Sequence, residues 1–163
     1  MNVSQITAKM IDYSTGNLHD INHFMKVYAY AKTIGECEQL DSNTQTTLEV
    51  AAILHDIACP LCRKKYGNTN GKYQEMEGTI LAEEFLNDSG YSKEFIERIA
   101  FLVGHHHTLK NIEGMDYQIL IEADYLVNAD EANLSEKNLH NALENIFKTK
   151  TGIFLLKSMY KIN

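Results

Sequence analysis

The dipeptide His55-Asp56 is the most distinctive chemical feature of this 163-residue chain. It follows a largely apolar run over residues 47–54, so a buried helix would deliver an imidazole and a carboxylate together. Burying either group without a partner costs free energy. His23 and Asp124 fit as partners, since each also lies within an apolar segment of helical periodicity. The imidazole and carboxylate donors of these four residues indicate a site for one divalent metal ion.

A purely structural interpretation of the same dipeptide is also open. In that case His55 would bind carbonyl groups at the end of its helix, and Asp56 would cap the turn that follows. The ordered set of His23, the His-Asp pair and Asp124, each near an expected core face, favours the metal site.

Helical spacing of apolar residues recurs along the chain, whereas strand-type alternation is scarce. The third expected helix starts within 41–44, ends at the His-Asp pair and is apolar nearly all round near its end, so it should be central and buried. Residues 58–72 contain the only proline and two glycines and are expected to form a loop. The other expected helices cover residues 4–13, 18–34, 74–87, 92–104, 116–127 and 135–147, and the tail 152–160 looks helical as well. We therefore expect an all-α fold, a single compact domain of about seven helices over residues 1–163.

The composition is that of an ordinary globular chain, with 44% hydrophobic and 23% charged residues. A formal net charge of -7 argues against nucleic acid as the main partner. No apolar run approaches the roughly 20 residues of a membrane span, and the first residues lack the pattern of a secretion signal. Three cysteines, an odd number, are typical of a reducing compartment, so Cys59 and Cys62 are expected as free thiols. These features predict a cytoplasmic protein without a membrane partner.

The sequence resembles the HD superfamily of metal-dependent phosphohydrolases. That family is helical and carries a histidine on one helix, a later His-Asp pair at the end of a buried helix, and a distant aspartate. The resemblance covers residues 18–128 and rests on His23, His55-Asp56 and Asp124 in their helical contexts. It implies that these residues hold one divalent transition metal (Mn, Fe, Co, Ni or Zn). It further implies that a metal-activated water hydrolyses a nucleotide or another small phosphate ester.

Some members of this superfamily bind two metals, through one further histidine and a pair of adjacent histidines. The first of these positions falls on Gln74, which is a poor transition-metal ligand, and the pair falls within His105-His106-His107. A weaker second site would use Gln74, His105 and His106, or His105 and His106 would bind substrate phosphate. The alternative is a polar helix end, where histidines favour the C-terminal dipole. Which two of the three histidines face inward is left open by the sequence.

Carboxylates near the expected site are candidates for proton transfer. Glu75, Glu77 and Asp56 could each act as general acid or base, or orient a water molecule. The alternative for the two glutamates is a solvated first helical turn, where carboxylates suit the helix dipole.

Positive charge gathers in the segment that directly follows the His-Asp pair. Arg63, Lys65 and Lys72 lie there, beside Lys64, and could contact phosphate. Ordinary solvated surface charge is the competing explanation.

The leading hypothesis is therefore a metal-dependent phosphohydrolase whose partner is a small phosphorylated substrate, with a nucleotide favoured. Two alternatives remain from the sequence. One is a di-iron oxygenase of the HD type, which needs the additional histidines. The other is a non-catalytic module that binds a metal or a nucleotide and signals to a partner. A homo-oligomer is compatible with the sequence and is not predicted by it.

Overall fold

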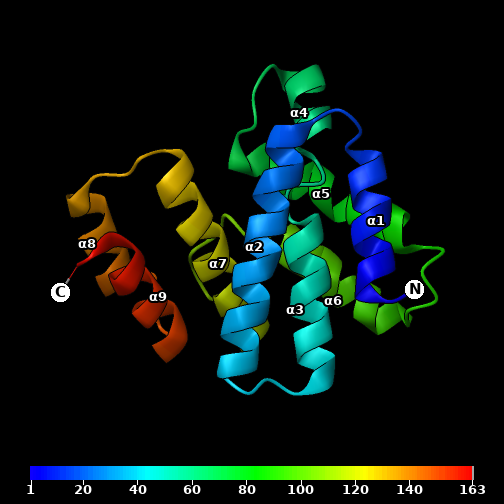
Figure 1. The fold of residues 1–163 in the computed structure, drawn as a ribbon. Coiled ribbons are helices and arrows are strands. Elements are labelled where there is room, and N and C mark those ends of the chain that lie inside the picture. The colour runs from blue at the N-terminus through cyan, green and yellow to red at the C-terminus, as the bar shows by residue number, and fades with distance from the viewer. Residues whose placement is uncertain (163) are drawn as a thin grey trace.

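The computed structural model describes residues 1–162, and over that range the chain is helical throughout, without strands (Figure 1). This confirms the predicted all-α fold. Nine helices occupy the described residues: α1 (Val3–Tyr13), α2 (Leu18–Cys37), α3 (Ser42–Leu54), α4 (Cys59–Tyr66), α5 (Gly71–Leu86), α6 (Lys93–Val103), α7 (Met115–Glu131), α8 (Glu136–Asn145) and α9 (Lys150–Tyr160).

Seven of these helices correspond to the seven expected ones, and α9 is the helical tail expected over residues 152–160. The addition is α4, which lies in the segment predicted as a loop, so that prediction was wrong over Cys59–Tyr66. Pro60 falls in the first turn of α4, where the missing N–H would have had no partner within the helix. Gly67 ends the helix with a φ of 70°, a left-handed conformation that glycine adopts without steric cost.

The central helix is α3, as the sequence predicted. It packs against α1, α2, α6 and α7, and every residue from Thr47 to Leu54 is buried. Asp41 begins the helix by accepting hydrogen bonds from the backbone N–H groups of Asn43 and Thr44. Since α2 and α7 also pack against each other, the C-terminal end of α3 lies where α2, α3 and α7 meet. His55-Asp56 therefore emerges between α2 and α7.

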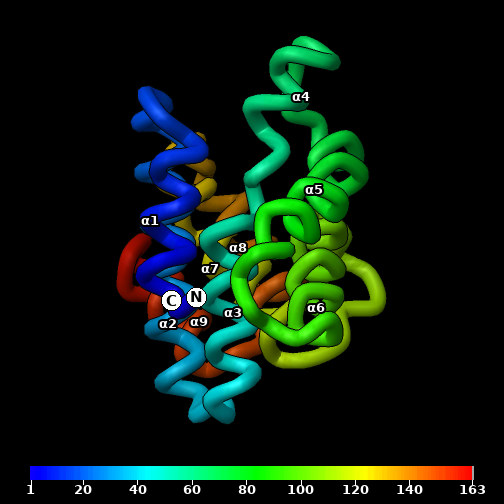
Figure 2. Tube along the Cα trace, turned by 90° about the vertical axis from the view of Figure 1, so that its right-hand side faces the viewer, coloured from blue at the N-terminus to red at the C-terminus, as the bar shows by residue number. Residues whose placement is uncertain are grey.

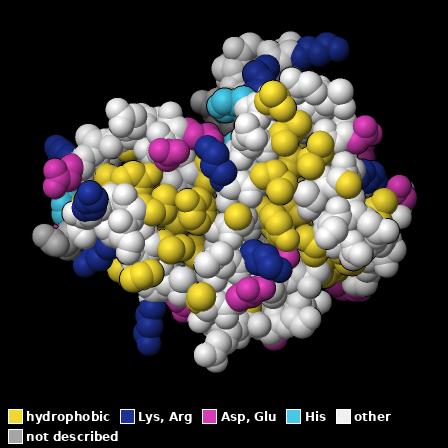
Figure 3. Space-filling view, viewed as in Figure 1, with side chains coloured by type: hydrophobic (Ala, Val, Ile, Leu, Met, Phe, Trp, Pro, Cys, Tyr) yellow, Lys and Arg dark blue, Asp and Glu magenta, His cyan; other side chains and the backbone are white. Residues whose placement is uncertain are grey.

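One end of the helix bundle carries α4, which lies at the top of both Figure 1 and Figure 2. Its main packing partner is α5, which follows it in the chain. The face shown in Figure 3 has hydrophobic side chains in two areas, one over α7 to α9 and one over α1 to α3. A homo-oligomer stays compatible with this surface, as it is with the sequence. Among the described residues, no helix combines the length and the apolarity that a membrane crossing requires.

A buried carboxylate joins α7 to the C-terminal helices. Glu122 is fully buried, and its Oε1 accepts hydrogen bonds from the backbone N–H groups of Lys148 (2.6 Å) and Thr149 (3.0 Å) and from Gln118 Nε2 (2.7 Å). Its Oε2 accepts from the Thr149 hydroxyl. A side chain at Gly152 would collide with this carboxylate, so only glycine fits there. Gln118 Nε2 also donates to the carbonyl oxygen of Ile146 at 2.8 Å, so the side chains of Glu122 and Gln118 together hold the segment between α8 and α9 onto α7.

Substituting Glu122→Gln is expected to destabilise the protein by about 2–3 kcal/mol, because one acceptor becomes an amide that faces buried donors. In a chain of this size that corresponds to a melting temperature lower by roughly 4–12 °C, measurable by thermal unfolding followed by circular dichroism. The matched control is Glu144→Gln on the exposed side of α8, which should leave the melting temperature unchanged. An equal effect of the two substitutions would contradict a special role for Glu122.

Candidate metal centre

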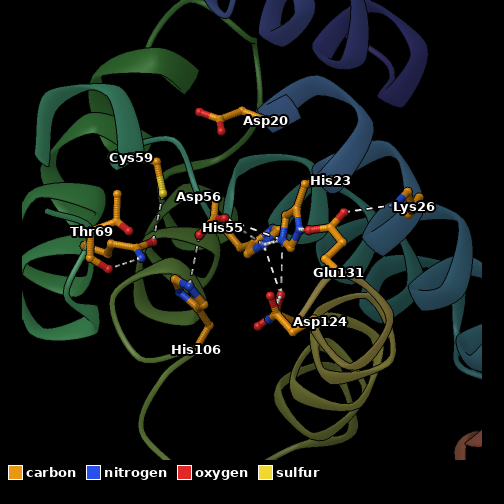
Figure 4. Close-up of polar contacts among 12 residues, drawn as sticks. Asp20, His23, Lys26, His55, Asp56, Cys59, Thr69, His106, Asp124 and Glu131 are labelled. Atoms are coloured by element: carbon orange, nitrogen blue, oxygen red, sulfur yellow. Dashed lines mark hydrogen bonds and ion pairs between the residues drawn. The ribbon is translucent and has the colours of Figure 1, made fainter. Parts of the chain in front are cut away.

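The four ligands predicted from the sequence lie together in the structure (Figure 4). His23 Nε2, from α2, lies 3.2 Å from His55 Nε2, 3.3 Å from Asp124 Oδ1 and 3.5 Å from Asp56 Oδ2. His55 Nε2 lies 3.5 Å from Asp124 Oδ1. His23, His55 and Asp56 offer ligand atoms that all fall within 4.8 Å of one another, close enough to hold one ion.

Hydrogen bonds fix both imidazoles so that Nε2 points into this cluster. His55 Nδ1 donates to the carbonyl oxygen of Ala52 at 2.8 Å, and His23 Nδ1 donates to Glu131 Oε2 at 2.9 Å. In a neutral ring the remaining nitrogen, Nε2, then carries a lone pair. Two lone pairs facing each other at 3.2 Å repel unless a proton or a cation lies between them. This arrangement is the one that metal-binding histidines adopt, with the second ring nitrogen held by a carboxylate or a carbonyl.

The electrostatics of the cluster point to a cation as well. Burial opposes protonation of His23, but its hydrogen bond to Asp124 and the charge of Asp56 prevail and raise its pKa to about 9. Burial also opposes ionisation of Asp56 and Asp124, yet the imidazoles around them hold the pKa of each carboxyl well below its usual range. The carboxylates therefore stay charged and attract positive charge, which a divalent ion supplies more strongly than one proton. The donor set fits a transition metal.

A second group of possible ligands extends from Asp56. It consists of Asp56, His106 and His107, whose ligand atoms also lie within 4.8 Å of one another. His106 Nδ1 donates to the carbonyl oxygen of Val103, and its buried Nε2 lies 3.5 Å from Asp56 Oδ1 without a hydrogen bond. His105 turns away, with its ring stacked on Phe101. The structure thus brings His106 and His107 to the site, whereas the sequence analysis named His105 and His106.

Gln74 lines the wall of the cavity in front of the cluster. This is the residue that was predicted to weaken a second metal site. Its Nε2 donates to the carbonyl oxygen of Thr69 at 2.8 Å, and its Oε1 accepts from Cys59 Sγ at 3.2 Å. Burial and the nearby charge of Asp56 raise the pKa of the Cys59 thiol, so it stays protonated and donates. Both the nitrogen and the oxygen of the Gln74 side-chain amide are therefore hydrogen-bonded within the protein. Cys59 and Cys62 are free thiols, as predicted.

The other candidates for proton transfer lie outside the cluster. Glu75 Oε1 accepts from the backbone N–H of His107 (3.1 Å) and the hydroxyl of Thr108 (3.0 Å), which fixes the segment after α6. Glu77 pairs with Lys65 at 2.6 Å and accepts from the Tyr66 hydroxyl. Neither glutamate lines the cavity. Of the three carboxylates named from the sequence, the structure places only Asp56 at the site.

Of the basic residues named from the sequence, Arg63 alone reaches the cavity. Its guanidinium forms an ion pair with Asp20 of α2, which also lines the cavity. Lys65 is bound to Glu77, and Lys72 is exposed at the start of α5. The cavity has a volume of about 180 Å³, and its wall carries the positive side chain of Arg63 together with the carboxylates of Asp20, Asp56, Asp124 and Glu131.

Sequence reasoning missed five polar residues of this cavity: His19, Asp20, Thr69, Asn128 and Glu131. Asn128 Nδ2 donates to Asp124 Oδ1 at 2.8 Å, and Glu131 holds His23. A usable signal was present, because positions 124, 128 and 131 have the spacing of one helical face. Glu131 also pairs with Lys26 at 2.9 Å, so its carboxylate is held by two side chains that are neighbours on one face of α2.

The chain belongs to the HD domain family, whose model matches residues 20–142. This is a family of metal-dependent hydrolases, and HD domains bind divalent metals, in agreement with the His/Asp cluster. The fold is similar to that of a predicted HD superfamily hydrolase from an uncultured Thermotogales bacterium, known from its crystal structure. That similarity has a TM-score of 0.70 at 21% identity and covers 97% of this chain and 84% of the other. No curated protein matches the chain.

Substituting Glu131→Gln is expected to weaken divalent-metal binding by roughly 10–100-fold, the usual effect of losing a partner that orients a ligating histidine. The amide cannot match the charge with which Glu131 holds His23 Nδ1–H. Calorimetric titration of the metal-free protein with Mn²⁺ or Ni²⁺ measures this directly. The control is Asp130→Asn, which removes an exposed neighbouring carboxylate of the same helix. Equal affinities for the Glu131→Gln and unmodified proteins would remove Glu131 from the site.

Proposed function

We propose that this protein is a metal-dependent phosphohydrolase that cleaves a nucleotide or another small phosphate ester. The observation that carries the proposal is the convergence of His23, His55, Asp56 and Asp124 beside one cavity, with the Nε2 atoms of both histidines directed at the carboxylates. Membership of the HD family supports hydrolysis as the reaction class. Arg63 on the cavity wall supports a phosphoryl group as the part of the substrate that is bound.

In this proposal His23, His55, Asp56 and Asp124 hold one divalent metal. Such an ion supplies positive charge that polarises phosphoryl oxygens and lowers the pKa of water. Asp56 has one oxygen 3.5 Å from His23 Nε2 and the other 3.5 Å from His106 Nε2, so it stands between the two groups of ligands. It can therefore accept a hydrogen bond from the attacking water and orient it. Its low pKa suits this orienting role better than that of a strong base.

The remaining residues would bind and position the substrate. The Arg63 guanidinium presents several donors in a plane that matches phosphoryl oxygens. In the structure this guanidinium is paired with Asp20, so on substrate binding Arg63 would exchange one anionic partner for another. In the hydrolysis, the water oxygen bonds to phosphorus, the P–O ester bond breaks, and a proton reaches the departing alcohol. His106 and His107 lie next to Asp56 and would be the groups that pass this proton on.

Substituting Asp124→Asn should remove most of the metal and reduce phosphatase activity by more than roughly 100-fold, since even an outer-sphere partner accounts for up to that factor. Elemental analysis of protein purified without added metal gives the metal content, and a panel of phosphate esters gives the activity. Glu77→Gln is the control, because Glu77 lies outside the cavity, and it should retain both metal and activity. Full turnover by Asp124→Asn would disprove the assignment. Two irons per chain would instead favour the oxygenase alternative, and bound metal without any turnover would favour the non-catalytic module.

Replacing Arg63 by Gln should lower kcat/KM for the best ester by about 10–100-fold, the equivalent of a charged hydrogen bond of about 1.5–3 kcal/mol. Most of the loss should appear in KM if the guanidinium binds the ground state and the transition state equally. Lys64→Gln provides a matched control, since it removes one positive charge from the next position of α4 without touching the cavity. If both variants lose activity equally, general surface charge rather than Arg63 attracts the substrate.

A further inference from the structure

A second pocket, of about 200 Å³, adjoins the metal-site cavity. His107, Asp124 and Asn128 line both spaces and form their common wall. The buried His106 also lines the second space, beside the common wall. The other part of its wall is apolar and consists of Leu109, Ile121, Tyr125 and Ile146, and we call the space against these four residues the apolar pocket. The proposed metal ligand Asp124 therefore has a charged cavity on one side and an apolar one on the other.

Both cavities are arranged along a single face of α7. Ile121, Asp124, Tyr125 and Asn128 fall within about 100° of one another around the helix axis, given 100° per residue. Ile121 and Asp124 are separated by about 4.5 Å along that axis. A group in the apolar pocket would thus lie one helical turn from a group bound at Asp124. That separation suits neighbouring parts of one small molecule.

The wall of the apolar pocket combines a fixed ring with an exposed side chain. The Tyr125 hydroxyl donates to the carbonyl oxygen of Asn138 at 3.1 Å, and its ring packs edge-on against Phe147 at 5.7 Å between centroids. Tyr125 consequently offers the pocket its apolar ring and no free hydroxyl. Leu109, in the segment between α6 and α7, is 50% exposed at the pocket. A bound apolar group would cover this leucine.

Size and charge limit what the apolar pocket can hold. Each of the two spaces is smaller than the roughly 300–1,000 Å³ of complete small-molecule sites, so each would accommodate only part of a ligand. None of the four apolar wall residues carries a charge. Against these four residues a charged or strongly hydrated group would lose water without gaining a partner. The pocket is therefore suited to a compact, uncharged group attached to something that binds next door.

We propose that the apolar pocket binds the leaving group of the substrate, which makes the substrates phosphate monoesters of alcohols that carry a compact uncharged apolar or aromatic group. This inference rests on the proposed phosphohydrolase function. The phosphoryl group would lie between Arg63 and the carboxylates, and the alcohol would extend past Asp124 towards Tyr125. Asn128, whose Nδ2 is engaged by Asp124, would offer Oδ1 to a hydroxyl at the junction.

The test compares esters that share a phosphoryl end and differ in the group beyond it. One pair is butyl phosphate and glycerol 3-phosphate, and the other is adenosine 5′-monophosphate and ribose 5-phosphate. The apolar or aromatic member of a pair should be favoured at least about tenfold in kcat/KM, the usual effect of one or two methylene groups in an apolar pocket. Preference in both pairs indicates general apolar selection, and preference in the second pair alone indicates selection for a nucleobase. Equal turnover within both pairs overturns the inference while leaving the phosphohydrolase function intact.

The variant Leu109→Ser should reduce this preference severalfold to about tenfold, because the apolar member of each pair loses an apolar contact. Its matched control is Ile80→Ser, which removes an apolar side chain of similar exposure (55%) from α5, outside both cavities. If Leu109→Ser and Ile80→Ser retain the same preference as the unmodified protein, the apolar pocket is not the leaving-group site.

A binding measurement separates this inference from the proposed function. Phenylphosphonate and methylphosphonate cannot be hydrolysed, and calorimetry on the metal-loaded protein gives their affinities. Tighter binding of the phenyl compound, lost in Leu109→Ser, supports the apolar pocket even if no ester is turned over. Equal affinities of the two phosphonates overturn it.

Discussion

Two carboxylates and two histidines cannot lie buried at one point without a positive charge among them. Asp56 and Asp124 remain ionised in this protein, and the His23 imidazole carries the compensating proton when no cation does. That requirement explains several features which would otherwise be unrelated. The Nδ1 atoms of His23 and His55 are occupied by acceptors, and every Nε2 in the cluster is directed inward. A helix bundle would gain nothing from such an arrangement unless a cation repaid the cost of burying the charges.

The position of α7 determines the geometry of this cluster. Glu122 and Asp124 are two residues apart, so their side chains leave the helix in nearly opposite directions. Asp124 faces α2 and the end of α3, whereas Glu122 accepts hydrogen bonds from the segment between α8 and α9. The C-terminal helices therefore hold the back of the helix whose front carries the site. Although α8 and α9 contribute no ligand to the cluster, they restrict how far α7 can shift away from His23.

Helical periodicity was sufficient to predict the all-α fold, and the resemblance to the HD superfamily grouped His23, His55, Asp56 and Asp124. His23 and Asp124 lie on long helices, and the His-Asp pair directly follows the apolar end of α3. Helical periodicity failed where the chain departs from long helices. Pro60 and the glycines around it suggested a loop, yet proline is favourable in the first turn of a helix, and α4 forms there. Residues 104–107 form a turn after α6, so no helical period could indicate that His107 rather than His105 faces the site. Glu75 and Glu77 were candidates because they lie near the expected site. Glu75 points about 100° away from Gln74 around the axis of α5, and Glu77 is held by Lys65 and Tyr66 of α4, outside the cavity.

The two cavities suggest how a site of this kind separates chemistry from selection. Residues that face the cluster, above all Asp56 and Asp124, are constrained by the charge they must hold, and changing one of them alters the whole electrostatic balance. The four apolar wall residues of the second pocket are free of that constraint. Leu109 lies in the segment between α6 and α7, so substitution there changes shape and polarity without touching the buried carboxylates. Related chains could therefore keep the cluster and alter the pocket, and the identity of the leaving group would vary while the reaction at phosphorus stays the same.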